Sequence, residues 1–104
     1  MKFKSSKIRK LEKNRYSIVT DNLDVCYLCG NKKENLHEVF FGEKHRKLSM
    51  QYGCVVPLCA MCHSNVHQNI QIDLQLKKRL ETAFIDVYGG DKDSFIKIFH
   101  INYL

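Results

Sequence analysis

Residues 59–67 read CAMCHSNVH: two cysteines three positions apart, a histidine next to the second, and another histidine four residues later. Tetrahedral zinc takes four ligands, and a C-x-x-C turn supplies two of them to one ion. A second such turn, CYLC, occupies residues 26–29. Together the two turns offer four thiolates, from Cys26, Cys29, Cys59 and Cys62. We therefore expect one structural zinc ion that fastens the two segments to each other.

Cys54 brings the number of cysteines to five, and an odd number fits a disulfide framework poorly. The basic N-terminus lacks the apolar core of a secretory signal, and no apolar run approaches the roughly 20 residues of a membrane span. We therefore expect a cytoplasmic protein with reduced thiols, in which Cys54 serves packing. Buried unliganded cysteines or a redox pair are the alternatives to zinc, but they leave the matched spacing of the two turns unexplained.

The length of 104 residues is typical of one domain, so we treat residues 1–104 as a single unit. The formal net charge is +6, and residues 1–15 hold seven of the seventeen Lys and Arg residues against one acid. A basic N-terminal arm of this kind is either a solvated tail or part of a surface that binds nucleic acid, and composition leaves both open.

Three short stretches have the β-branched and aromatic content of strands: residues 16–20 (YSIVT), 36–41 (LHEVFF) and 54–58 (CVVPL). Pro57 keeps the last of them at an edge or an end of its sheet. The polar, basic residues 43–52 are expected to be a connection between the second and third strands.

The second half of the chain has a helical pattern. Residues 60–68 can form a short helix directly after the third strand. The next helix is predicted from apolar residues at i, i+4, i+7, i+8 and i+11, which are Leu76, Leu80, Ala83, Phe84 and Val87. A Gly-Gly pair ends that helix, and one of two aspartates after the pair can cap a last helix within residues 94–104. We expect the helices of residues 73–104 to pack on residues 26–67.

Two histidines of the opening stretch remain free once the four thiolates bind one ion. His63 and His67 stand four residues apart, so on a helix they share a face and can bind a second ion together. A further ligand is expected from the dipeptide His37-Glu38 on the preceding strand. The alternatives are that one histidine replaces a cysteine on the zinc, or that both lie on the surface of a zinc ribbon.

The features follow a fixed order: a C-x-x-C turn, a strand with a histidine, a loop, a short strand ending in PLC, and C-x-x-C-H-x-x-x-H on a helix. This order resembles the HNH endonucleases, in particular those encoded by bacteriophages and prophages. The likeness covers residues 26–67 and extends more weakly to the closing FIKIFHINYL. It implies an α+β domain with a ββα-metal core, a four-cysteine zinc clamp and C-terminal helices packed on the core, working in a bacterial cytoplasm.

The resemblance implies a phosphodiesterase that cuts or nicks DNA with one divalent ion, Mg²⁺, Mn²⁺ or Zn²⁺. In this family a histidine of the first strand is the general base, and helix histidines hold the ion. Carried over, His37 is the base, Glu38 a ligand or orienting group, and His63 and His67 the metal ligands. The family's strand pair commonly ends in the base, so the opposite assignment, with His37 on the metal and Glu38 as base, stays open. Cys54 stands where the family typically has an asparagine.

Three basic residues between the strands, Lys44, Arg46 and Lys47, are expected to contact DNA phosphates beside the cut. Such contacts position DNA without reading its sequence. A solvated charged loop is the competing interpretation, and His45 within it is expected to be exposed rather than catalytic. The alternative to a nuclease is a non-catalytic zinc module, derived from the same fold, that binds nucleic acid or protein.

Overall fold

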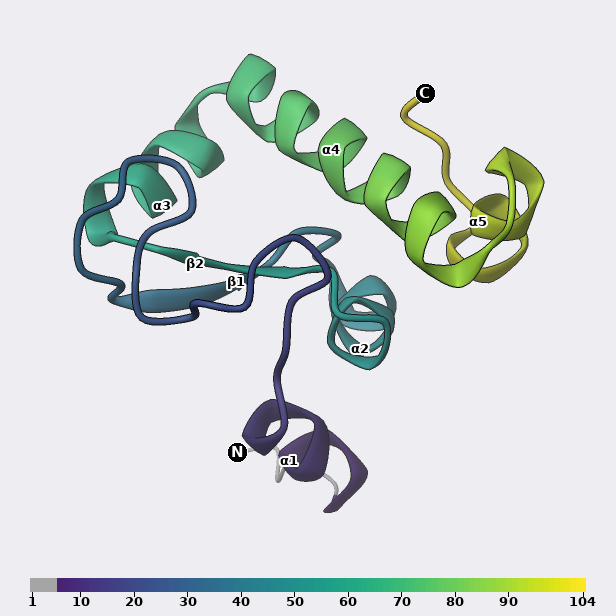
Figure 1. Cartoon of the computed structure of the whole chain (residues 1–104), viewed down its shortest axis with the longest axis horizontal. Helices are drawn as coiled ribbons and strands as arrows, with labels where there is room; N and C mark the ends of the chain where they lie inside the picture. The colour runs from purple at the N-terminus through teal and green to yellow at the C-terminus, as the bar shows by residue number, and fades with distance from the viewer. Residues whose placement is uncertain (1–5) are drawn as a thin grey trace.

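Two antiparallel strands form the sheet of this computed structural model, which describes residues 6–104. His37 lies opposite Val56 in the pair, and Glu38 lies opposite Val55. Helices surround the strands, so the fold is α+β, as the sequence predicts (Figure 1). The elements of residues 6–104 are α1 (Ser6–Lys13), β1 (Asn35–Glu38), α2 (Glu43–Gln51), β2 (Val55–Leu58), α3 (Ala60–Gln68), α4 (Ile70–Tyr88) and α5 (Lys92–Phe99).

The first strand is shorter than the predicted stretch of residues 36–41, because a serine side chain takes the place of the next strand partner. The hydroxyl of Ser49 accepts a hydrogen bond from the N–H of Phe40 at 3.2 Å and donates one to its carbonyl at 2.8 Å. Phe40 therefore stays fully paired and buried although it lies beyond the ladder.

Residues 43–52 are not the predicted connection, since α2 occupies almost all of them. Its Glu, Lys, Arg, Leu, Met and Gln residues favour helix, but only Leu48 and Met50 are apolar, which is too few for a recognisable stripe. The chain then turns at Gly53 with a φ of +73°, and a Cβ there would lie 2.5 Å from a ring carbon of Tyr16. Glycine meets both demands, the positive φ and the close approach.

Residues 16–20 are not the predicted strand either. Their backbone makes one hydrogen bond to the turn before β2, from Ile18 N–H to the Gly53 carbonyl at 2.9 Å. One such bond does not form a strand ladder. Ile18 and Val19 pack against the core as partly buried side chains. The apolar content of this stretch therefore reflects packing rather than strand pairing.

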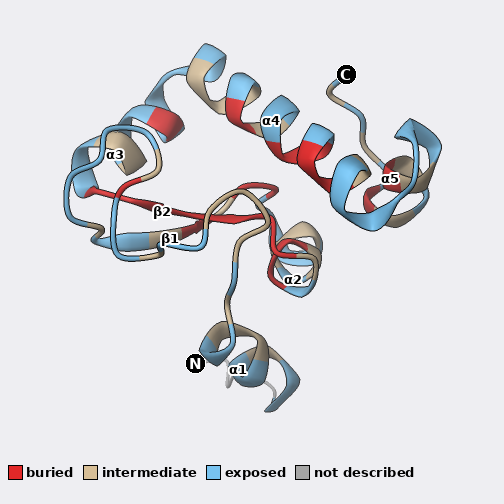
Figure 2. Cartoon of the chain, viewed as in Figure 1, coloured by how far each residue is buried: buried red, intermediate tan, exposed pale blue. Residues whose placement is uncertain are grey.

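The predicted basic arm of residues 1–15 forms a helix over Ser6–Lys13, and residues 1–5 lie outside the described part of the chain. This helix, α1, has no buried residue and contacts α2 (Figure 2). Its sequence, SKIRKLEK, holds four cations and few apolar groups. Helix α1 therefore lies on the surface of the domain and contributes no fully buried side chain to the core.

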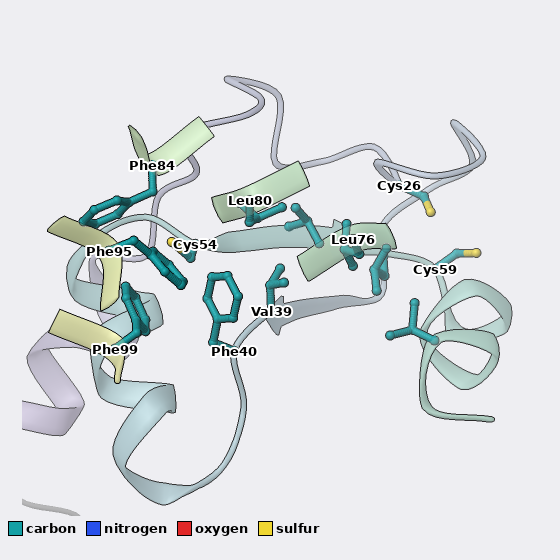
Figure 3. Packing of buried hydrophobic residues seen from close by; sticks show 13 residues of the cluster. Cys26, Val39, Phe40, Cys54, Cys59, Leu76, Leu80, Phe84, Phe95 and Phe99 are labelled. Atoms are coloured by element: carbon teal, nitrogen blue, oxygen red, sulfur yellow. The ribbon is translucent and has the colours of Figure 1, made fainter. Parts of the chain in front are cut away.

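The core lies between the strands and the C-terminal helices. Figure 3 shows four phenylalanines, from the end of β1, from α4 and from α5, gathered against one another. The rings of Phe95 and Phe99 stack with centroids 4.6 Å apart, and Phe40 lies 5.2 Å from Phe95 and 5.0 Å from Phe99. The predicted apolar stripe of α4 faces this cluster, except that Val87 is exposed.

The predicted helix ends are confirmed in outline. Asn69 caps α4 through hydrogen bonds from Gln71 and Ile72, so this helix begins three residues before residue 73. Gly89 ends it in the left-handed conformation, and Asp91 caps α5. No helix in residues 6–104 is long and apolar enough to span a bilayer.

The last helix ends at Phe99, and the tail that follows is held by a buried carboxylate. Glu81 Oε1 accepts a hydrogen bond from the N–H of Tyr103 at 2.7 Å. Burial raises the pKa of Glu81 despite this bond. The prediction of a helix through residues 94–104 therefore extends five residues too far.

Candidate metal centres

The four paired cysteines form one cluster, as predicted. Their sulfurs all lie within 4.8 Å of one another, and those of Cys29 and Cys59 are 3.6 Å apart. Two sulfurs bound to tetrahedral zinc at 2.3 Å are separated by about 3.8 Å, so the spacing suits this ion. Figure 3 shows the sulfurs of Cys26 and Cys59 on adjacent segments, where the first turn meets the start of α3.

Local backbone geometry prepares two of these sulfurs, those of Cys26 and Cys59, for a cation, whereas burial and the neighbouring thiols raise the pKa of Cys62. Burial raises the pKa of Cys26, but the backbone N–H groups of Cys59, Cys29 and Leu28 outweigh it and lower the pKa to about 6. Cys59 caps the N-terminus of α3, where its sulfur accepts a hydrogen bond from Cys62 N–H at 3.4 Å. A helix N-terminus favours the thiolate form that binds metal.

A second cluster consists of three histidines, one from β1 and two from α3: His37, His63 and His67. Ring nitrogens of all three lie within 4.8 Å of one another, and Nε2 of His63 is 3.2 Å from Nε2 of His67. Two nitrogens on tetrahedral zinc, at 2.0–2.1 Å each, are separated by about 3.3 Å. The donors therefore suit one divalent ion with a fourth position left open.

Burial favours the neutral, metal-binding form of two of these imidazoles, those of His37 and His63. His37 is 3% exposed, and burial followed by the charges of His63 and His67 lowers its pKa to about 4. Burial and His67 also lower the pKa of His63. Nε2 of His37 is buried with no hydrogen-bond partner among residues 6–104, a cost that a cation at this nitrogen removes.

The side chain of Glu38 lies outside the histidine cluster, in an ion-pair network. Its Oε1 accepts a hydrogen bond from Nη2 of Arg15 at 2.6 Å and lies 3.3 Å from Nε of Arg46. Arg46 in turn donates to Glu12 at 2.7 Å. His37 therefore lies with the helix histidines, and Glu38 lies outside their cluster.

The ion-pair network beside the histidines was only partly foreseen. The sequence predicts a DNA contact for Arg46 and a basic arm that includes Arg15, but it predicts no role for Glu12. The sequence contains no signal for these pairs, because their partners stand 23 and 34 residues apart. Arg46 lies in the network with a third of its side chain exposed, while Lys44 and Lys47 are exposed on α2.

An aromatic ring and a charge pair also border the histidines. The exposed Phe41 has its ring 5.4 Å from that of His67 and 6.0 Å from that of His37. The ammonium of Lys77 lies 4.3 Å from the Phe41 ring centre and 2.8 Å from a carboxylate oxygen of Asp73. These residues of β1's end and α4 were not identified from the sequence, since they belong to no motif.

Two residues of the α2 region have structural roles. His45 is partly buried rather than exposed, and its Nε2 lies 2.9 Å from the carbonyl of Phe99, which ties α2 to α5. Cys54 is fully buried in the core, and burial raises its pKa to about 12. Its backbone holds the turn, through hydrogen bonds from its N–H to the Ser49 carbonyl and from Val39 N–H to its carbonyl.

Searches of protein-family models, of curated proteins and of solved structures give no match to this chain. The resemblance to HNH endonucleases therefore stays a prediction from the order of the sequence motifs.

Proposed function

We propose that this protein is a metal-dependent nuclease of the ββα-metal (HNH) type that hydrolyses phosphodiester bonds in DNA. The observation that carries the proposal is the convergence of His37, His63 and His67 beside a separate four-cysteine cluster. Four thiolates complete a zinc shell, whereas three imidazoles leave a position for water or substrate. The cysteine cluster suits a structural ion, and the histidine cluster suits a catalytic one.

A divalent ion at the histidines would supply positive charge beside the scissile phosphate and lower the pKa of a coordinated water. Imidazoles bind metal through neutral nitrogens, and burial favours that form by lowering the pKa of His37 to about 4 and by lowering the pKa of His63. Because His37 comes from β1 and the other two from α3, the site depends on the contact between strand and helix. Metal binding there should also stabilise that contact.

The base role falls to Glu38 when His37 is a metal ligand. A carboxylate can take a proton from water, and the contacts of Arg15 and Arg46 both use Oε1 rather than Oε2. The two guanidiniums also match phosphate oxygens. A DNA backbone can therefore compete with Glu12 and Glu38 for Arg46.

The charge of the chain supports a nucleic-acid partner. The formal net charge is +6, and Lys44 and Lys47 expose their ammonium groups on α2, the helix that also carries Arg46. Such a surface attracts phosphates without regard to sequence, and its affinity falls steeply with salt.

A non-catalytic zinc module is the second candidate, and the pairing of Glu38 favours it. A carboxylate bound to Arg15 at 2.6 Å and close to Arg46 is engaged by its own protein rather than by a substrate water. In that case the histidine cluster serves stability, and the basic surface binds nucleic acid or protein.

Cleavage of supercoiled plasmid separates the two candidates. Purified protein is incubated with Mg²⁺, Mn²⁺ or Zn²⁺ in turn, beside His63→Ala and Glu38→Gln. Ser64→Ala, on the exposed side of the same helix, is the matched control. We expect metal-dependent cutting that His63→Ala abolishes, that Glu38→Gln slows by about 10²–10⁴-fold, and that Ser64→Ala retains.

Nicked or linear product then reports whether one strand or both are cut. If wild type cuts neither plasmid nor single-stranded or branched DNA under any of the three ions, the nuclease is rejected and the zinc module remains.

A further inference from the structure

A pocket of about 300 Å³ lies where α1, α2 and α5 meet. Figure 1 shows α2 between the other two helices. All three helices contribute residues to the pocket. Apolar side chains of each helix line it, including Leu11, Leu48 and Phe99. Neither the sequence motifs nor the two metal clusters account for this pocket.

The charged lining of the pocket is entirely basic. Lys7, Lys44 and Lys47 are its charged lining residues, and no acidic side chain of residues 6–104 lines it. A ligand that fits must therefore combine an anionic group with an apolar body. The volume stands at the lower end of the range for small-molecule sites, about 300–1,000 Å³, so the body is small.

Helix α2 links the pocket to the strand that carries His37. Lys44 and Lys47 of this helix line the pocket. Arg46 of the same helix lies 3.3 Å from Glu38, the residue after His37. A strand of DNA held along α2 can therefore reach the pocket.

We propose that this pocket binds one unpaired nucleotide of the substrate, with the base among the apolar side chains and its phosphates at the lysines. A nucleotide has a base that can pack against the apolar side chains and a phosphate whose negative charge matches the lysines. The proposal names the substrate class of the nuclease proposed above and rests on it: DNA with an unpaired base, as in single strands or branches. A base stacked inside an intact duplex cannot enter unless it is flipped out.

Fluorescence anisotropy with the full-length chain tests the proposal. The His63→Ala background removes cutting, so the measurement reads binding alone. The probes are a labelled single strand of 12 thymidylates, a strand with the same phosphates but no bases, and the corresponding duplex. We expect the strand with bases to bind about tenfold more tightly than the baseless strand, as for one stacked base, and more tightly than the duplex.

Two variants locate the effect in the pocket. Gln51→Trp, which fills the pocket from an exposed position of α2, should bring the ratio between the strands with and without bases close to one. Lys44→Ala/Lys47→Ala should weaken single-strand binding more than Lys78→Ala/Arg79→Ala, which removes two exposed cations from α4.

The proposal is overturned if both strands bind alike, if Gln51→Trp leaves their ratio unchanged, or if the two charge variants weaken binding equally. Equal weakening by the two charge variants would mean that the lysines attract DNA only through the general positive charge of the surface. Binding that follows the expected pattern in a protein that never cuts DNA keeps the pocket and rejects the nuclease. If the protein cuts DNA but its binding does not show this pattern, the nuclease proposal stands and the pocket proposal is rejected.

Discussion

Loss of one cysteine of the cluster should remove zinc and much of the stability. Cys29 and Cys59 are 30 residues apart in sequence, and their sulfurs 3.6 Å apart in space, so a bound ion closes a loop of that length. The entropy of closing about 30 residues, −2.1 − 1.5R ln n cal/mol/K, corresponds to about 4 kcal/mol at 25 °C. Domains of this size have unfolding free energies of about 5–15 kcal/mol, so Cys62→Ser should be near the threshold of folding.

Urea unfolding with zinc analysis measures this effect. Wild type should contain zinc and become less stable on chelation, whereas Cys62→Ser should lose about 4 kcal/mol and respond little to the chelator. Cys54→Ala is the matched control, because Cys54 is a buried cysteine outside the cluster. It should keep the zinc content. Retention of zinc by Cys62→Ser with a loss below about 1 kcal/mol would refute the idea that the cluster staples the fold.

Two further perturbations have results fixed by the structure. Without added divalent ion, the unfolded chain protonates His37 near pH 6.5 but the folded chain only near pH 4, so stability should fall as the pH falls through this window. Between pH 7 and 4.5 wild type should lose about 2–3 kcal/mol more than His37→Gln in urea unfolding, and an equal loss would contradict the burial argument. Gly53→Ala should lower the midpoint of thermal unfolding more than Gly89→Ala, because both have positive φ but only the first would place a Cβ against Tyr16. Equal shifts would mean that the ring moves aside without cost.

The prediction of the first metal cluster from sequence was possible because its information is local. A C-x-x-C spacing presents two sulfurs to one point in any chain, and four-residue spacing on a helix puts His63 and His67 on one face. The caps and the α4 stripe follow in the same way from the spacing of residues within one element. The helix in residues 43–52 was not predicted, because α2 is stabilised by residues with high helix propensity and by burial of Met50, and it has no apolar stripe in its sequence.

The sequence alone determined the two pairs of thiols, the helix that carries the histidines, and the α+β alternation. Only the tertiary structure decided that His37 joins His63 and His67, that Arg15 and Arg46 bind Glu38, and that three helices enclose a basic pocket. The reason is physical: spacing within an element follows from backbone geometry, whereas contacts between different elements, such as that of Arg15 with Glu38 across 23 positions, follow from how the elements pack.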